Sequence, residues 1–362
     1  MLTTILATVI VLGILVFVHE LGHFLLAKKL GVAVLKFSLG FGPKLIGKKI
    51  GETEYQIAVF PLGGFVKPLG EDPQEEVKEE ERHRSLWAQP VWKRALIIGA
   101  GPFFNFFLAA LFFSIVNLIS GIPSIPTIPP RIEEVTANLP AAQAGLQKGD
   151  LILSIDGKDV SKWDDLSRII RSSQGRDLLL KLKRDGEILE IKVTPKSSTQ
   201  KNLFGEEVSL FVIGIAPPPI KVERKRVGPA LALGYGFIQT WDGIRLIVIG
   251  IVKLIQGVIP ADQIGSPIMI AKMAGEQARR GIIDLVIFTA VISLNLGVLN
   301  LFPIPILDGG HFLFLILEAI LRRPVSLKKM EIAQMVGLVL IILLMLFAIR
   351  NDVVRYFFPG GG

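Results

Sequence analysis

The sequence predicts an α-helical polytopic membrane protein with four transmembrane helices, a strand-forming segment after the first helix, and one inserted domain of strands and helices. Three observations support this fold class. The 362 residues are 51% hydrophobic with a mean hydropathy of +0.54, although 20% are charged. The charges are clustered and leave apolar stretches of about 18 residues or more, long enough to cross a bilayer. Between two of these stretches lies a segment of soluble composition, about the size of one small domain.

Four apolar segments are predicted to span the membrane: about Leu2–Ala27, Ala95–Ser120, Ile282–Phe302 and Ile332–Ile349. The first has no basic residues before it, and Lys28-Lys29 stand where a cleaved signal peptide would have small residues, so we expect a retained helix. A fifth segment, Ile244–Ile259, is short and carries Lys253 near its middle. By composition it could be a span or a helix lying in the interface.

The distribution of basic residues predicts the orientation of the chain. Residues 28–94 contain twelve Lys and Arg, and Arg322–Lys329 contains four. Cytoplasmic loops are enriched in these residues, so residues 28–94 and 303–331 are expected inside, and the N-terminus, residues 121–281 and the C-terminus outside. The net charge of +8 follows from this asymmetry, and we do not expect a nucleic-acid partner.

Two segments outside the spans are predicted in more detail. Phe37–Gly70 is rich in Gly and Pro, and Glu54–Phe60 and Phe65–Lys67 have the patterns of strands. At membrane depth, their backbone groups would need partners in protein or water. Glu71–Arg84 is a run of charges and is interpreted as a solvated linker.

Residues 126–217 are predicted to form the inserted domain. Asp156-Gly157 and Asp185-Gly186 are typical of hairpin turns, and Ala141–Ala144 and Trp163–Ser172 look helical. Strands are expected at Arg131–Val135, Leu151–Ile155, Leu178–Leu182, Ile188–Val193 and Val212–Ile215.

The first span contains the pattern of a metal site, His19-Glu20-Leu21-Gly22-His23. The chain has no cysteine and four histidines, so a metal must be held by His, Asp or Glu. On a helix, His19 and His23 lie on one face and can bind one zinc ion, while Glu20 can act as a general base on water. The alternative is a polar contact within the bundle, but ionisable groups inside an apolar helix are expensive and mark functional sites.

A catalytic zinc site needs a third protein ligand, and Asn300–His311 is the expected donor segment. Pro303 and Pro305 interrupt the helix there. Asp308 is the best candidate ligand, with His311 as the alternative. Asn300 could donate to the developing oxyanion or to substrate backbone, or simply form a hydrogen bond between helices.

The depth of these ligands bears on the topology. His19 and His23 lie near the cytoplasmic end of the first span, and Asp308 must reach the same depth. If Ile244–Ile259 also crossed, Asp308 would leave the membrane on the far side, separated by much of the roughly 30 Å core. We therefore expect this segment to be interfacial or re-entrant.

Together these residues resemble the site-2 protease family of intramembrane zinc metalloproteases. His19–His23 in an N-terminal span and Asn300-x-x-Pro303-x-Pro305-x-Leu307-Asp308-Gly309 in a late span carry the resemblance, which covers nearly the whole chain. Within the family, the chain is similar to the bacterial regulator of sigma-E protease group. Residues 37–70 resemble the family's membrane-re-entrant β-hairpin. Residues Pro140–Asp150 and Ile152–Gly157 resemble a PDZ domain, and the 121–227 insertion has room for one.

The resemblance implies the following organisation and residue roles. Gly101-Pro102-Phe103-Phe104-Asn105 resembles a family motif in which Asn105 contacts substrate, as Asn300 and Pro303 are also expected to do. The strand-forming segment would pair with an unwound substrate through Glu54, Tyr55, Gln56, Ile57, Ala58, Gly63, Gly64 and Phe65. The expected boundaries are 1–27, 95–120, 282–310 and 332–350 for the spans, 28–94 and 311–331 for cytoplasmic segments, 121–217 for an extracytoplasmic PDZ domain, 218–281 for interfacial helices and 351–362 for the tail.

The implied function is zinc-dependent cleavage of single-span proteins within or near the bacterial inner membrane, after a first protease has removed their outer domain. Anti-sigma factors and remnant signal peptides are the implied substrates, and membrane lipid is a further partner. The PDZ domain would act as a size filter or bind a peptide tail. Two rival interpretations are a non-catalytic PDZ-bearing scaffold with a relic metal site, and a zinc transporter, for which the second and fourth spans offer too few polar residues.

Overall fold

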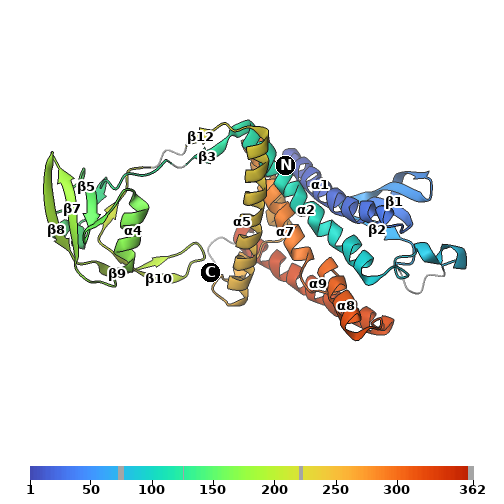
Figure 1. The fold of residues 1–362 in the computed structure, drawn as a ribbon. Coiled ribbons are helices and arrows are strands. Elements are labelled where there is room, and N and C mark those ends of the chain that lie inside the picture. The colour runs from blue at the N-terminus through green and yellow to red at the C-terminus, as the bar shows by residue number, and fades with distance from the viewer. Residues whose placement is uncertain (72–76, 125, 220–222, 358–362) are drawn as a thin grey trace. The chain divides into compact units, whose positions relative to one another are not determined.

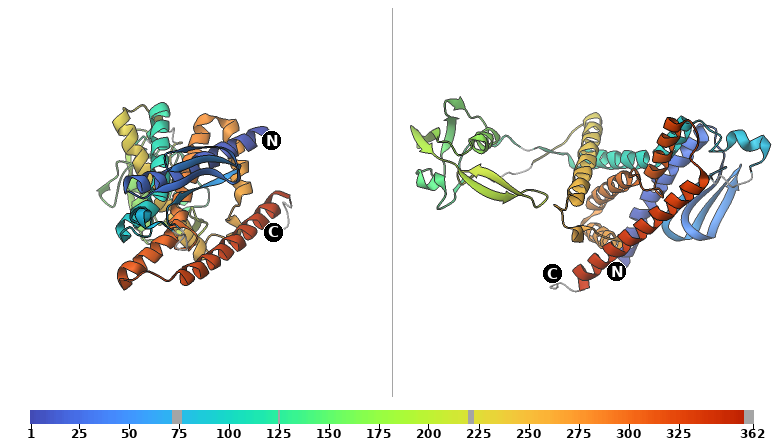
Figure 2. Two further views of the ribbon diagram at one scale, coloured as in Figure 1. Left: turned by 90° about the vertical axis from the view of Figure 1, so that its right-hand side faces the viewer. Right: turned by 90° about the horizontal axis from the view of Figure 1, so that it is seen from below.

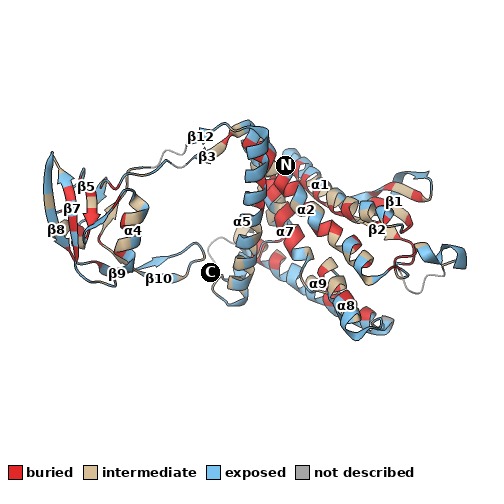
Figure 3. Cartoon of the chain, viewed as in Figure 1, coloured by how far each residue is buried: buried red, intermediate tan, exposed pale blue. Residues whose placement is uncertain are grey.

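The computed structural model describes residues 1–71, 77–124, 126–219 and 223–357, and its contacts divide the chain into two units. The first unit is formed by residues 1–120, 227–254 and the chain from residue 260 onward. The second is formed by residues 121–226 with residues 255–259. Each unit has its own buried core, shown in Figure 3, and each is described by itself.

Long helices dominate the first unit (Figure 1). They are α1 (Leu2–Lys29), α2 (Val91–Ser120), α5 (Pro229–Ile255), α6 (Pro267–Arg280), α7 (Ile282–Asn300), α8 (Asp308–Leu321) and α9 (Leu327–Phe357). Among the described residues, α1, α2, α7 and α9 are the helices long and apolar enough to cross a membrane. The four predicted spans are therefore present as four such helices, and α5, which contains most of Ile244–Ile259, is not one of them.

Most of the first half of residues 311–331, expected as a cytoplasmic segment, is helical. Residues 308–321 form the helix α8, which begins at Asp308 itself. Its sequence is almost entirely apolar after His311, so it forms a helix that packs against α2. Its 14 residues would measure about 21 Å at 1.5 Å per residue, which is shorter than a bilayer core.

Helices α1, α2 and α7 lie side by side, and the right-hand view of Figure 2 shows the β-strands beside α1. Small residues permit the close approach of α1 to α2. A Cβ atom added to Gly22 would lie 2.4 Å from the carbonyl oxygen of Ala100. Apolar side chains of α1, α2, α6 and α7 pack together in one buried cluster, which includes Ala7, Val11, Leu15, Leu108, Ala274 and Phe288.

Two long strands, β1 (Val34–Ile50) and β2 (Thr53–Pro68), form the strand segment predicted after the first span. Each strand folds back, so that the pair presents four rows. Residues 36–39 lie between residues 54–57 and residues 64–67, and residues 54–57 also face residues 46–49. The two outer rows are therefore residues 44–50 and residues 63–68. The row at 63–68 packs against α1, where a Cβ atom on Gly64 would lie 2.9 Å from Val16 and 3.3 Å from Glu20.

Glu52 ties the turn of this sheet to the end of α1. Lys28 donates to Glu52 at 3.0 Å and Arg84 donates to it at 2.6 Å. Burial raises the pKa of Glu52, but the hydrogen bonds from these two cations outweigh it and hold the pKa below its ordinary value. The carboxylate is therefore ionised at neutral pH and fastens the turn of the sheet to residues 28 and 84.

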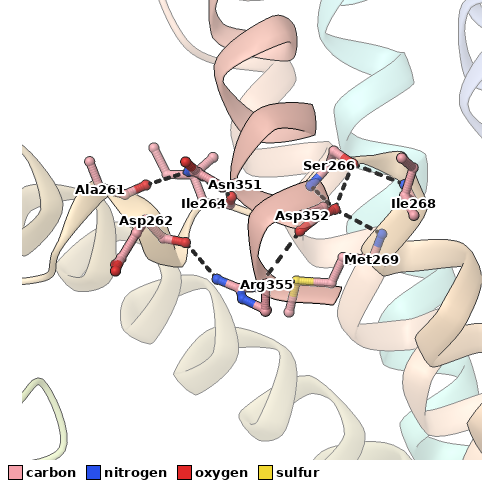
Figure 4. A network of polar contacts seen from close by, with 9 residues as sticks. All are labelled: Ala261, Asp262, Ile264, Ser266, Ile268, Met269, Asn351, Asp352 and Arg355. Atoms are coloured by element: carbon pink, nitrogen blue, oxygen red, sulfur yellow. Dashed lines mark hydrogen bonds and ion pairs between the residues drawn. The ribbon is translucent and has the colours of Figure 1, made fainter. Parts of the chain in front are cut away.

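A buried carboxylate joins α9 to the start of α6 (Figure 4). Asp352 accepts hydrogen bonds from the backbone N–H and hydroxyl of Ser266, at 2.9 and 2.6 Å, and from the N–H of Met269 at 3.0 Å. The neighbouring Asn351 donates to the carbonyl of Ala261 at 3.0 Å. Removing Asp352 would leave buried donors unpaired, which is costly, so this junction fixes residues 261–269 on α9.

The second unit is built around the sheet β6–β5–β7–β8. Its elements are β3 (Ile122–Ser124), β4 (Glu134–Val135), α3 (Pro140–Gln143), β5 (Leu151–Ile155), β6 (Lys158–Asp159), α4 (Trp163–Ser172), β7 (Leu178–Arg184), β8 (Glu187–Val193), β9 (Lys196–Lys201), β10 (Glu207–Val212), β11 (Ile215–Ala216) and β12 (Glu223–Lys225). Asp156 and Gly157, like Asp185 and Gly186, have positive φ angles in hairpin turns, as their sequences predict.

Sequence patterns located most of this unit but missed its outlying pairs of strands. β5 and α4 have the predicted bounds. The hairpin of β9 and β10 was not predicted, because its residues Lys196–Lys201 are polar and carry little alternation. The pairing of β3 with β12 joins residues about a hundred positions apart and has no local signature.

Candidate metal centre

Three predicted ligands meet between α1 and α8. His19 and His23 are one helical turn apart on α1, and Asp308 is the first residue of α8. The Nε2 atoms of the two histidines are 3.3 Å apart. The Oδ2 atom of Asp308 lies 3.3 Å from Nε2 of His19 and 3.6 Å from Nε2 of His23. These residues form a group that could hold a metal ion.

The spacing of these atoms fits a tetrahedral zinc site. With zinc–ligand bonds of about 2.0–2.1 Å and tetrahedral angles, ligand atoms lie about 3.4 Å apart. The three separations of 3.3, 3.3 and 3.6 Å agree with that geometry. Moreover, Oδ2 of Asp308 is buried and has no hydrogen-bond partner among the described residues, as suits an atom that binds a metal. The residues present therefore fit zinc.

The other nitrogen of each histidine is held by α2. Nδ1 of His23 lies 2.8 Å from the backbone carbonyl oxygen of Ile97. That oxygen can only accept, so His23 carries its proton on Nδ1 and directs the free electron pair of Nε2 toward Asp308. Nδ1 of His19 lies 3.1 Å from the side-chain nitrogen of Asn105.

Gly101 provides the space that both imidazole rings occupy. A Cβ atom at this position would lie 2.3 Å from Nε2 of His23 and 2.7 Å from Cε1 of His19. No side chain can be placed so close to the rings without displacing them. The absence of a side chain at residue 101 is therefore part of the site's geometry.

A cavity of about 520 Å³ opens beside the three ligands. Glu20 and Asn300 reach it from α1 and α7, and the strand residues Gly63–Val66 and Pro68 form one wall. The Asn300 side-chain nitrogen is 3.4 Å from Nε2 of His19, which places an amide donor next to the ligand atoms. The cavity thus combines a carboxylate base, an amide donor and a strand edge around one candidate metal position.

The geometry bears on two alternatives that the sequence left open. Asp308, and not His311, has its ligand atom beside both histidines. His311 is one turn further along α8 and lines the same cavity. Asn300 faces the cavity and its side-chain nitrogen contacts His19 of α1, a position that fits a donor to substrate or oxyanion and also a hydrogen bond between helices.

Two of the predicted substrate contacts are placed elsewhere. Asn105 is fully buried and faces His19, and it is not among the described residues that line the cavity. Pro303 is exposed in the turn between α7 and α8 and is also absent from the described lining. The sequence motifs identified the correct neighbourhoods but could not show which way each side chain points.

The structure also changes the prediction of which strand residues pair with substrate. Residues 54–57 already face residues 36–39 on one side and residues 46–49 on the other. Their backbone groups cannot pair with another strand, and Ala58, opposite Lys44, is also inside the sheet. Gly63, Gly64 and Phe65 lie in the row next to the cavity, where the described partner is on one side only.

One structural pair at the site was missed by sequence reasoning. Arg94 at the start of α2 is 5% exposed and donates through both terminal nitrogens to Glu318 of α8. Its Nε donates to the carbonyl of Gln89 at 3.0 Å. The pair fastens α8, and with it Asp308, to the helix that orients the histidines. A charge in the last third of an apolar helix, as at Glu318, was the available signal.

Comparison with known proteins identifies the family of the chain. The model of peptidase family M50 matches residues 7–344. The chain belongs to peptidase family M50. It is therefore a membrane-embedded metalloendopeptidase, and the four long apolar helices described above agree with that class.

Several curated relatives match over nearly their whole length. "Putative zinc metalloprotease mll0638" of Mesorhizobium japonicum is 36% identical over 97% of this chain and 98% of its own. Regulator of sigma-W protease RasP of Bacillus subtilis is 32% identical over 98% and 99%, respectively. Zinc metalloprotease RasP of Geobacillus kaustophilus is 31% identical over the same shares. Among solved structures, a PDZ domain of an SdrC-like protein from Listeria monocytogenes covers 26% of the chain and 93% of its own at 21% identity, with a TM-score of 0.21, too low to assign the fold.

Proposed function

We propose that this metalloendopeptidase holds one zinc ion between His19, His23 and Asp308 and hydrolyses peptide bonds within or near the membrane-spanning segments of its substrates. The observation that carries the proposal is the meeting of three ligand atoms, at separations that fit zinc, beside Glu20 in a cavity between apolar helices. The names of the relatives, two of which contain the words zinc metalloprotease, support the choice of metal.

The chain's own residues supply the remaining chemistry. Bound zinc would act as a Lewis acid that polarises the scissile carbonyl. Glu20 takes the proton of the attacking water and returns it to the leaving amine. The amide of Asn300 donates to the carbonyl oxygen as negative charge develops there, because its nitrogen already lies beside the ligand atoms.

A helical substrate must be extended before its backbone can be cleaved. Gly63, Gly64 and Phe65 line the cavity, and the described strand partners of Gly64 and Phe65 lie on one side only, so an unwound segment can add to them as a strand. Backbone hydrogen bonds to this edge would hold the scissile bond against Glu20 without requiring a particular sequence.

The position of the site and the names of the relatives support a substrate class. We propose single-span membrane proteins whose outer domain a first protease has removed, namely anti-sigma factors and remnant signal peptides. The name regulator of sigma-W protease, given to the Bacillus subtilis relative, supports the first of these classes. Residues 121–217 would be an extracytoplasmic PDZ domain that excludes bulky substrates, and residues 37–70 a hairpin re-entering the inner membrane from the cytoplasm.

The proposal is tested by removing the base while keeping the ligands. Glu20→Gln is expected to abolish cleavage of a single-span reporter and to leave one zinc bound per chain, because Glu20 is not one of the three ligands. Asp308→Ala should lose the metal as well. Cleavage by the Glu20→Gln protein would refute the mechanism, and unchanged zinc content in Asp308→Ala would refute the ligand set.

A further inference from the structure

Asn105 lies in the second layer around the candidate metal, not in the substrate cavity. It is on α2, its side chain is fully buried, and its amide nitrogen is 3.1 Å from Nδ1 of His19. We propose that Asn105 is a positioning residue that holds His19 in the orientation and tautomer needed to bind zinc through Nε2. This inference rests on the zinc site of the proposed function.

A neutral histidine that binds a metal through one ring nitrogen carries a proton on the other, and that N–H needs a hydrogen-bond acceptor. Nε2 of His19 faces His23 and Asp308, so a neutral His19 that binds metal there carries its proton on Nδ1. That N–H needs an acceptor. Oδ1 of Asn105 is buried and has no hydrogen-bond partner among the described residues. A half-turn of the carboxamide about its last side-chain bond brings this oxygen to Nδ1, and the orphaned acceptor and the buried donor then satisfy each other.

The two histidines thus use different acceptors on one helix. His23 donates to a backbone carbonyl, that of Ile97, which no substitution can remove. His19 depends on a side chain two turns further along α2. Of these two acceptors, only the one that serves His19 belongs to a side chain and can be removed by substitution.

The backbone of Asn105 is held by α7, whereas its side chain faces His19 on α1. The hydroxyl of Ser293 on α7 donates to the backbone carbonyl oxygen of Asn105 at 2.7 Å. One turn earlier on α2, Gly101 leaves the space in which the imidazole rings lie. Helix α2 therefore presents a gap for the rings and an acceptor for one of them on the same face, at positions four residues apart.

The experiment compares zinc affinity in two variants of the full-length protein. Asn105→Leu has nearly the same shape but no acceptor, and Asn105→Asp keeps an acceptor for Nδ1–H. Competition with a chromophoric chelator should show zinc binding about 10–100-fold weaker in Asn105→Leu, the usual effect of losing such a partner, and within a few-fold of the original in Asn105→Asp. The absorption spectrum of the Co²⁺-substituted protein should change in Asn105→Leu, because the ring can then tilt.

Asn117→Leu is the matched control. Asn117 is a buried asparagine on the same helix, but it donates to Gln239 at 2.9 Å, away from the metal position. Its loss should lower thermal stability without changing zinc affinity or the Co²⁺ spectrum. If Asn105→Leu does not fold, Asn105→Ser replaces it, because the short hydroxyl cannot reach His19 and the same fall in affinity is expected.

The opposite result would assign Asn105 to substrate. Unchanged zinc affinity in Asn105→Leu, with a raised KM at saturating zinc, would overturn the positioning role. This failure is distinguishable from failure of the proposed function. If only the positioning role fails, the unmodified protein still binds zinc and Glu20→Gln is still inactive. If the proposed function fails, at least one of these two results is not obtained.

Discussion

At the scale of single residues, the site depends on side chains that are small or oriented by a neighbour. The rings of His19 and His23 fit between α1 and α2 because residue 101 is glycine. Their outer nitrogens are held by Ile97 and Asn105, so the inner nitrogens face Asp308. Ligand identity alone therefore does not make the site, because the orientation of each ring is set by α2.

The space at Gly101 gives a prediction at this scale. In Gly101→Ala the new methyl group would overlap both rings, so we expect zinc affinity to fall at least tenfold and cleavage to fall with it. Isothermal titration of the purified protein measures the affinity. Gly13→Ala on α1 is the control, because nothing lies within 4 Å of a Cβ atom there. Equal zinc affinity in both variants would show that the rings do not occupy this space in the metal-bound protein.

At the scale of elements, the sheet next to α1 has two outer rows of different character. Gly63–Val66 and Pro68 line the cavity, whereas residues 44–50 form the opposite edge of the sheet. Leu45, Ile46 and Ile50 in the second row are exposed. Because only the first row lies beside Glu20, strand addition that leads to cleavage must occur there.

The two rows can be distinguished by photocrosslinking. A benzophenone side chain at Phe65 should capture a single-span substrate in the inactive Glu20→Gln background, because the substrate would lie against that row. The same group at Ile46, which is 72% exposed, should capture little or none. Mass spectrometry of the crosslinked product identifies the captured segment. Preferential capture at position 46 would place the substrate at the edge of the sheet that is away from Glu20, and this result would contradict the proposal.

At the scale of the whole molecule, one geometric requirement links the site to the topology. His19 and His23 are near the end of α1 that carries Lys28 and Lys29, and Asp308 follows α7. The three atoms meet, so the chain after α7 must return to the depth of that end of α1. We propose that α5, which is not among the candidate spans, does not cross the membrane, so that α1, α2 and α7 cross in alternating directions and bring Asp308 to that depth.

Labelling of introduced cysteines tests this topology, since the chain has no cysteine of its own. Pro260→Cys is exposed between α5 and α6 and should react with a membrane-impermeant maleimide from the outside of whole cells. Glu79→Cys, exposed in the segment between α1 and α2, should react only after the membrane is opened. Labelling of residue 260 from the cytoplasmic side alone would mean that α5 crosses the membrane.

Much of this protein could be predicted from local patterns. Apolar length located α1, α2, α7 and α9, because a bilayer imposes a minimum length on any helix that crosses it. The spacing of His19 and His23 placed two ligands on one face, because helical periodicity is local. Asp308 could be named because it is an ionisable residue just after a helix broken by two prolines.

Only the tertiary structure decided which atoms meet across helices and which strand edge is free. Asn105 faces His19 rather than the cavity, and residues 54–57 are paired on both sides while residues 63–65 are not. Arg94 and Glu318, more than two hundred positions apart, hold α8 in place. Sequence periodicity specifies the face on which a residue lies, but the partner of that face depends on packing between segments distant in the chain. The sequence by itself thus determined the chemistry of the site, and the packing of α2 and α8 against α1 determined its geometry.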